Sequence, residues 1–179
     1  MQDGTDGIDM SLRLREATEN DLDTLVRMRV SLQKHLEARD PNIWKFSRRG
    51  FEIAPLEVKA RLRSKNSFMG VAEDENGRIL GMIMAEAAQD EYRDPERFGH
   101  IHWVYVEEER RRESLGRSLV KMALNFFSRR GIEQITIGYV VNNPEAHAFW
   151  DKLGFVARVT HSSATMSALV NKLSAPKIL

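Results

Sequence analysis

Two histidines separated by one residue are the side chains in this sequence best suited to acid–base chemistry. His100 and His102 stand in a run of aromatic and β-branched residues that predicts a strand. Because side chains alternate along a strand, both imidazoles should point to one face, with Ile101, Trp103 and Tyr105 on the other. Imidazole titrates near neutrality, so either histidine could act as a general base, directly or through a water molecule. The alternative is that one or both are ordinary polar residues on a partly exposed strand.

A charged segment, residues 106–119, follows this strand directly: Val-Glu-Glu-Glu-Arg-Arg-Arg-Glu-Ser-Leu-Gly-Arg-Ser-Leu. Its second half begins a predicted amphipathic helix, and a helix N-terminus presents unpaired N–H groups that can hold a phosphate. Gly116 would let such a ligand approach the backbone closely. Arg111, Arg112 and Arg117 could add charge-assisted hydrogen bonds to phosphate oxygens. The alternative is a solvated loop, because the glutamates of this segment balance its arginines.

The pattern of the chain predicts the elements that would position these groups. Strands are expected at residues 12–15, 68–72, 79–88, 100–106 and 132–141, with room for two more in residues 155–170. Helices are expected at residues 20–38, about 55–65, 114–130 and 144–153. Asn76 and Gly77 between two apolar runs predict a hairpin. This order favours an α/β (α+β) domain in which helices cover a mixed sheet.

Composition narrows the class of protein. The 179 residues fit one domain, residues 11–179, behind a flexible leader of residues 1–10, in which Met10 is a candidate start of translation. The absence of cysteine excludes disulfides, thiolate metal sites and a cysteine nucleophile, and no cluster of His, Asp and Glu has metal-ligand spacing. A net charge of +1 argues against nucleic-acid binding. The apolar runs are too short to cross a membrane and no signal peptide is seen, so a cytoplasmic location is expected.

Two motifs resemble those of the GNAT N-acetyltransferase family. Residues 111–116, Arg-Arg-Glu-Ser-Leu-Gly, are similar to the family's Arg/Gln-x-x-Gly-x-Gly/Ala pyrophosphate loop, at the family's distance from a strand that ends in valine. Residues 143–155, Asn-Pro-Glu-Ala-His-Ala-Phe-Trp-Asp-Lys-Leu-Gly-Phe, are similar to its second signature, Asn-x-x-Ala-x-x-(Phe/Leu)-Tyr-x-x-x-Gly-Phe. The resemblance spans about residues 12–173 and implies a mostly antiparallel sheet of six to seven strands flanked by about four helices.

The resemblance also implies roles at matching positions, with acetyl-CoA as the acetyl donor. The backbone of Val104, Tyr105 and Val106 would run beside the pantetheine arm, in a slot where this strand parts from the one beginning at Ile132. The residues that would wrap the pyrophosphate are Arg111, Arg112, Glu113, Ser114, Leu115, Gly116 and Arg117. The residues implied near the pantetheine and the thioester are Asn143, Phe149 and Trp150.

The family also suggests what the histidines would do. The His-x-His spacing ahead of the strand's last valine is similar to that of serotonin (arylalkylamine) N-acetyltransferase, and position 100 corresponds to the glutamate base of histone-type members. This implies that His100 or His102 removes a proton from an incoming ammonium group. Glu86 is a weaker candidate for that role, because it could equally be an exposed strand carboxylate.

Two residues depart from the family pattern. Ser114 stands at the first glycine of the loop, although serine is a good N-cap and its N–H could still face a phosphate. Trp150 stands where a tyrosine commonly protonates the leaving thiolate, and an indole cannot replace a phenol as an acid. The general acid is therefore open, with Tyr139, Tyr105 or water as candidates.

The expected activity is N-acetyl transfer from acetyl-CoA to a primary amine by direct attack in a ternary complex, since no cysteine could carry an acyl group. The expected partners are acetyl-CoA and a small-molecule or peptide amine, without a metal, nucleic acid or membrane, and the family makes a homodimer plausible. The alternatives are acetylation of a protein N-terminus or lysine, a different acyl donor, and a non-catalytic acyl-CoA sensor. Nucleic-acid binding through residues 110–112 is disfavoured by the neighbouring glutamates.

Overall fold

A computed structural model describes residues 12–40, 45–111 and 114–174 of the chain. The chain divides into two compact units, one ending at Val140 and the other beginning at Val141, and each is described by itself. The first unit contains the sheet, the histidine pair and the charged segment. The second contains the motif at residues 143–155.

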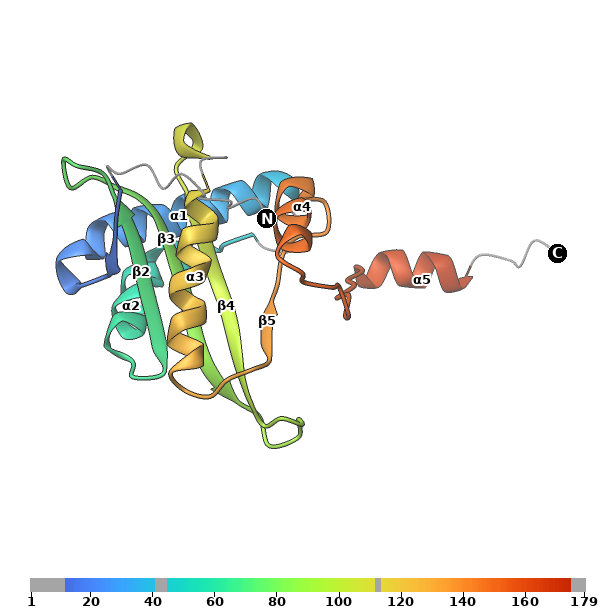
Figure 1. Ribbon diagram of the computed structural model, residues 1–179. Coiled ribbons are helices and arrows are strands. Elements are labelled where there is room, and N and C mark those ends of the chain that lie inside the picture. Colours follow the sequence, from blue (N-terminus) through green and yellow to red (C-terminus); the bar gives the residue numbers. More distant parts are fainter. Residues whose placement is uncertain (1–11, 41–44, 112–113, 175–179) are drawn as a thin grey trace. The chain divides into compact units, whose positions relative to one another are not determined.

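The first unit is built on a five-stranded sheet whose strands lie side by side in chain order (Figure 1). Four of them, β1 to β4, pair antiparallel, and β5 pairs parallel to β4. The strands are β1 (Arg13–Glu16), β2 (Ser67–Glu73), β3 (Ile79–Gln89), β4 (Arg97–Val106) and β5 (Ile135–Ile137). The expected mixed, mostly antiparallel sheet is confirmed.

The hairpin between β2 and β3 follows from its turn residues. Gly77 has a φ of +77°, a left-handed conformation that costs glycine little. The Asp74 carboxylate accepts hydrogen bonds from the amides of Asn76 and Arg78, at 3.0 and 2.9 Å. These contacts close the turn and confirm the predicted hairpin.

Helices cover both faces of this sheet (Figure 1). On one face lie α1 (Leu22–Arg39) and α2 (Arg48–Arg63), over a core that includes Met82, Met84 and Trp103. On the other lies α3 (Leu115–Ser128), which buries the apolar arc expected from its sequence, including Leu119, Ala123 and Phe126. A Cβ atom at Gly81 would lie 3.2 Å from Leu119 Cδ1, so glycine lets α3 approach β3 closely.

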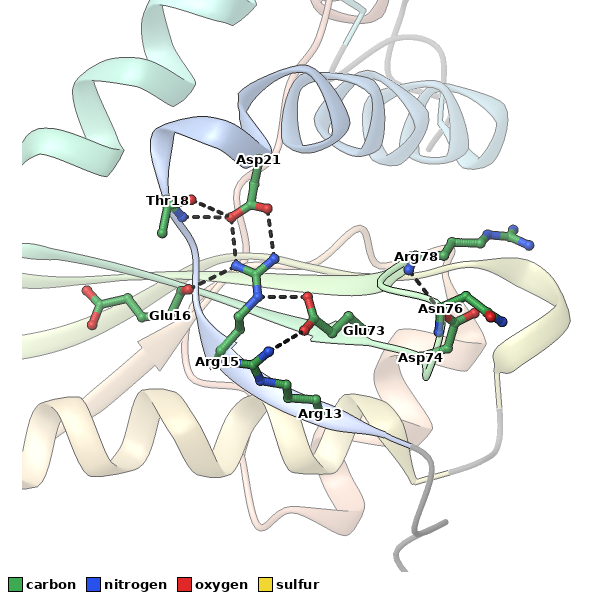
Figure 2. A network of polar contacts seen from close by, with 9 residues as sticks. All are labelled: Arg13, Arg15, Glu16, Thr18, Asp21, Glu73, Asp74, Asn76 and Arg78. Atoms are coloured by element: carbon green, nitrogen blue, oxygen red, sulfur yellow. Dashed lines mark hydrogen bonds and ion pairs between the residues drawn. The ribbon is translucent and has the colours of Figure 1, made fainter.

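A network of ion pairs ties the start of α1 to the sheet (Figure 2). The guanidinium of Arg15 on β1 makes two hydrogen bonds to Asp21, both of 2.8 Å, and a third of 2.7 Å to Glu73 on β2. Asp21 also accepts from the backbone N–H of Thr18 at 2.7 Å. The hydrogen bonds from Arg15 lower the pKa of the buried Asp21 to about 2. Asp21 is therefore held ionised at neutral pH.

The second unit contains α4 (Pro144–Lys152) and α5 (Met166–Ser174). Asn143 caps α4, because its Oδ1 accepts from the amide of Ala146 at 3.2 Å, and Pro144 occupies the first turn. Gly154, with a φ of +88°, ends the helix as its place in the motif predicts.

Three details of the predicted elements are wrong. Helix α2 begins at Arg48 rather than near Pro55, because Ser47 accepts from Gly50 N and caps an earlier turn, and Pro55 lies inside the helix. Strand β5 is limited to three residues of the expected ten. Residues 155–165 form no strand and residues 166–174 form a helix, so the described residues hold five strands and five α-helices instead of six or seven strands and about four helices.

Candidate active site

Strand β4 contains a β-bulge at His102. Met84 pairs with Trp103 and the next residue of β3, Ala85, pairs with Ile101, which leaves His102 as an extra residue opposite the gap. The bulge shifts the alternation of β4 by one position beyond this point. Trp103 consequently packs in the core beneath α1 and α2.

The two imidazoles lie together as the alternation predicts, but the bulge corrects the expected direction of the residues beyond them. The rings of His100 and His102 meet edge to face, with centroids 4.4 Å apart, so their pairing on one face is confirmed. They lie on the same face as Trp103 and Tyr105, since all four share that face with Met84 and Glu86 of β3. The expectation that Trp103 and Tyr105 point away from the histidines is therefore wrong, because the extra residue turns the strand.

An ion pair lies against one of the imidazoles. His102 Nε2 is 2.8 Å from Glu86 Oε2, and Glu86 Oε1 is 2.8 Å from the guanidinium of Arg61 on α2. The side chains of His102 and Glu86 are 27% and 26% exposed. Glu86 is thus a half-buried carboxylate held between a cation and an imidazole, and not a freely exposed strand residue.

The other imidazole meets β5. His100 Nδ1 is 2.7 Å from the hydroxyl of Thr136, which in turn donates to the carbonyl of Gly99 at 3.2 Å. The parallel register of β4 and β5 places His100 and Thr136 side by side. Three strands, β3, β4 and β5, therefore fix the histidine pair.

Burial makes both imidazoles weaker bases than free histidine. It lowers the pKa of His100 to about 4, assisted by the neighbouring His102 and opposed by Glu86. Burial also lowers the pKa of His102, against the raising effect of its hydrogen bond to Glu86. Both rings are therefore uncharged at neutral pH and available to accept a proton.

The sheet opens just beyond the histidines. Described pairing between β4 and β5 ends at Ile101 and Ile137. Glu107 N donates to Leu80 O on the β3 side, so the backbone groups of Tyr105 also face β3 and those of Val104 and Val106 face the opposite, open edge. This edge presents the backbone N–H donors of Val104 and Val106, whereas the backbone of Tyr105, also predicted to run beside the pantetheine, faces β3. The contact of Val104 and Val106 with the cofactor stays a prediction.

The charged segment leads from this edge to α3. Arg111 Nε donates to the carbonyl of Val106 at 3.2 Å. Ser114 is the N-cap of α3, and the first helical hydrogen bond is donated by Ser118 N to Ser114 O. The amides of Leu115, Gly116 and Arg117 precede that bond and form the first turn, where an anion is stabilised. Arg112 and Glu113, also predicted to bind pyrophosphate, lie outside the described residues.

Ser114 has a left-handed backbone, with a φ of +57° and a ψ of 0°. Glycine adopts this conformation readily, whereas a residue with a Cβ atom is strained by it. The position thus has the geometry of the glycine that the pyrophosphate motif carries there. The hydroxyl of Ser114 makes no capping hydrogen bond, contrary to the expected N-cap role of the side chain.

A comparison with protein families decides the assignment. The profile of the Acetyltransferase (GNAT) family matches residues 32–155, more than half of the chain. The chain belongs to this family. The match includes the histidine strand, the charged segment and the motif at residues 143–155.

Solved structures share the fold of this GNAT acetyltransferase. A tetramutant of the BH1408 protein from Bacillus halodurans superposes with a TM-score of 0.76 at 18% identity, covering 86% of this chain and 99% of that one. Aminoglycoside 6'-N-acetyltransferase AAC(6')-Ih from Acinetobacter baumannii gives 0.68 at 14% identity, covering 87% and 99%. The aminoglycoside acetyltransferase meta-AAC0020 from an uncultured soil metagenomic sample, in complex with sisomicin, gives 0.66 at 19%, covering 89% and 99%.

The second GNAT motif has its own geometry within the second unit. Phe149 and Trp150 meet edge to face at 4.8 Å, and Trp150 meets Phe155 in the same way at 5.2 Å. Asn143 uses its side-chain oxygen to cap α4. The motif therefore folds as a capped helix with an aromatic cluster, and the predicted contacts of Asn143, Phe149 and Trp150 with the cofactor stay predictions.

The candidate acids differ in their surroundings. The Tyr105 hydroxyl donates to Glu107 at 3.3 Å, and Glu107 is also 2.8 Å from Arg27. Burial, followed by the charge of Glu107, raises the pKa of Tyr105. It is thus a poorer proton donor than a free phenol. Tyr139 is half-buried just after β5.

Sequence reasoning did not find Arg61 and Thr136. Each lies on an element distant in sequence from β4, and neither stands in a motif, so only the folded register brings it to the histidines. Among the described residues, no group of three or more His, Asp or Glu side chains could hold a metal ion. The helices of the described segments are all too short or too polar to cross a membrane.

Proposed function

We propose that this GNAT acetyltransferase transfers an acetyl group from acetyl-CoA to a primary amine, by direct attack within a ternary complex. The observation that carries the proposal is the bulge of β4, which sets the histidine pair beside an edge with backbone donors at Val104 and Val106. A proton acceptor and donors for a developing oxyanion are the two parts that acyl transfer to an amine needs.

The residues of the first unit fit acetyl-CoA by the chemistry of their donors. The edge of β4 beyond Ile101 would hold the amide-containing pantetheine arm through the backbone of Val104 and Val106. The first-turn amides of α3, with Arg111 and Arg117, would hold the pyrophosphate. When bound, acetyl-CoA supplies an activated acetyl group as its thioester. The predicted contacts of Arg112, Glu113, Asn143, Phe149 and Trp150 belong to the same proposal.

The chain's own groups would then manage protons and charge. A histidine of the pair takes a proton from the ammonium group, so that the amine nitrogen has a lone pair for attack. The amides of Val104 and Val106 donate to the carbonyl oxygen as negative charge develops on it. Since Trp150 replaces a phenol, water or Tyr139 would protonate the departing thiolate.

The acceptor is a small-molecule or peptide amine in this proposal. Two of the similar structures are described as aminoglycoside acetyltransferases, one of them in complex with sisomicin, which supports aminoglycosides as one class to test. Polyamines, arylalkylamines and peptide N-termini share the required amine.

The test is an acceptor panel of putrescine, tryptamine, sisomicin and an unblocked tetrapeptide, read by release of the CoA thiol. The protein adds no thiol background because it contains no cysteine. Turnover that disappears in the His100→Ala, His102→Ala double variant supports the proposal. Tight binding of acetyl-CoA without turnover on any amine would instead identify a sensor of acyl-CoA.

A second measurement tests the cofactor edge without an acceptor. Hydrogen exchange should be faster at the amides of Val104 and Val106 than at Tyr105, and acetyl-CoA should slow the first two. Equal protection with and without acetyl-CoA would remove this edge from the proposal.

A further inference from the structure

The hydroxyl of Thr136 determines which nitrogen of His100 carries the hydrogen. A threonine hydroxyl has one hydrogen to donate and two lone pairs that accept. A Thr136 hydroxyl that donates to the carbonyl of Gly99 has no hydrogen left for His100, so the arrangement that satisfies both contacts has an Nδ1–H of His100 donating to Thr136 at 2.7 Å. In this arrangement neutral His100 has an unprotonated Nε2.

The contact with Glu86 assigns the opposite tautomer to His102, with the hydrogen on Nε2. A carboxylate that forms an ion pair with a guanidinium, as Glu86 does with Arg61, offers its oxygens as hydrogen-bond acceptors. The 2.8 Å contact is therefore an Nε2–H of His102 that donates to Glu86, which leaves Nδ1 of the neutral ring unprotonated. The two adjacent imidazoles thus hold opposite tautomers.

The partners also differ in what they do to an imidazolium. When His102 gains a proton, its Nε2–H already faces a carboxylate, which stabilises the positive charge. When His100 gains a proton, its Nδ1–H faces only a neutral hydroxyl, and burial opposes the charge. The geometry favours protonation of His102.

We infer that His102 is the proton acceptor of the proposed reaction, through Nδ1, and that Glu86, Arg61 and Thr136 are positioning residues. This inference rests on the proposed function. The N–H bond of the ammonium group breaks, its electron pair stays on the amine nitrogen, and the proton forms an N–H bond at His102 Nδ1. His102 then passes this proton to water. His100 stays neutral and accepts a hydrogen bond from the ammonium group or a water through Nε2.

The charges around the pair come from several elements. Glu86 lies on β3, Arg61 and Glu57 lie on α2, and Arg93 lies in the loop before β4. Glu86 and Glu57 raise the pKa of His102, and Arg61 lowers it. Removing Glu86 or Arg61 therefore has opposite effects on the same imidazole.

The first experiment needs no substrate. Nitrogen-15 NMR of the five histidines, assigned with His100→Asn and His102→Asn variants, should find His100 as the Nδ1–H tautomer and His102 as the Nε2–H tautomer. Thr136→Val should let His100 lose its fixed tautomer, and Thr136→Ser should keep it. The opposite tautomer in either ring of the unaltered protein, or no change in Thr136→Val, would overturn the inference. If Thr136→Val does not fold, the unaltered protein and Thr136→Ser still decide it.

The second experiment measures kcat against pH with the amine that the panel turns over fastest. Glu86→Gln should lower kcat roughly 10²-fold without changing KM for acetyl-CoA, and should move the acid limb to lower pH. Arg61→Gln should move the limb to higher pH. Arg63→Gln, which removes an exposed cation from the same helix, is the matched control and should leave it in place.

The outcomes separate this inference from the proposed function. If an amine is turned over but Glu86→Gln and Arg61→Gln do not shift the limb in opposite directions, His102 is not the base and the acetyl-transfer function stands. If no amine is turned over, the proposed function and the assignment of a base fall together, while the NMR result still decides the tautomers.

Discussion

Phe127 of α3 lies directly over Gly99 of β4, so closely that a Cβ atom at Gly99 would meet the ring at 2.8 Å. Phe127 is almost fully buried and cannot swing away. The contact sets the distance between α3 and the strand one residue before His100. Because Gly99 has no side chain, the packing of α3 against β4 is linked to the position of His100.

Gly99→Ala should consequently destabilise the protein by about 1–3 kcal/mol, the usual cost of overpacking a core. Phe127→Leu will destabilise the protein by itself. When Gly99→Ala is added to the Phe127→Leu variant, however, it should lower the free energy of unfolding much less than it does in the unaltered protein. Urea unfolding of the two single variants and the double variant measures this. Strictly additive effects would show that the two residues do not compete for the same space.

Ser114→Gly should stabilise the protein by about 0.5–1 kcal/mol, because it relieves a left-handed backbone at the start of α3. Thermal unfolding checks the sign. Ser118→Gly, in the interior of the same helix, is the matched control and should destabilise by about 0.5 kcal/mol.

The same Ser114→Gly variant tests the pyrophosphate loop. It should bind acetyl-CoA at least as tightly as the unaltered protein in calorimetry, because glycine keeps the backbone amide in place. A large loss of affinity would mean that the hydroxyl itself contacts the ligand, contrary to the assigned match between residues 111–116 and the family's loop.

Asp21→Asn should destabilise the protein at neutral pH by about 2 kcal/mol. This is the free energy that corresponds to lowering the pKa of Asp21 from 3.8 to about 2. The folded-state pKa of about 2 lies below the usual value of 3.8, so the contribution is present above pH 4 and is lost as the pH falls towards 2. The variant and the unaltered protein should thus converge in stability at low pH. Urea unfolding at several pH values measures the difference, and a constant gap down to pH 2 would contradict this account.

Protonation of His100 should lower the stability of the protein at a higher pH than protonation of Asp21 does. Its folded-state pKa of about 4 lies below the usual 6.5, so the unfolded chain binds the proton first as the pH drops. Stability from this group is complete above about pH 6.5 and is lost towards pH 4. The pKa of His102 is lowered in the same direction. His100→Asn, whose amide can still donate to Thr136, should show a flatter pH dependence in this range, and an unchanged slope would argue against a buried neutral imidazole.

Much of the fold could be predicted because its signals are local. Apolar periodicity located α1 and α3, and the turn residues Asn76 and Gly77 located a hairpin. The pairing of the two histidines was also predictable from their spacing. The bulge that turns Trp103 and Tyr105 to the same face was not predictable, since nothing in the residue types of β4 marks the extra residue.

The errors arise where tertiary structure decides. Ser47 caps α2 and starts it well before Pro55, which lies inside the helix. Residues 155–165 have β-compatible types, but a strand forms only where a neighbour offers hydrogen bonds. The partners of the imidazoles, Thr136 and Arg61, could not be predicted for a similar reason, because their proximity depends on sheet register and helix packing.

The strand order also implies the order in which the contacts of the two histidines form during folding. Glu86 and His102 are 16 positions apart on adjacent antiparallel strands, whereas His100 and Thr136 are 36 positions apart and meet only after the chain has crossed over through α3. Contacts between near neighbours in the chain form early in folding, and parallel pairing through a crossover forms late. The emerging chain should therefore acquire a carboxylate-paired His102 first, and a copy that fails to dock β5 should retain that pair while His100 exchanges between its two neutral forms.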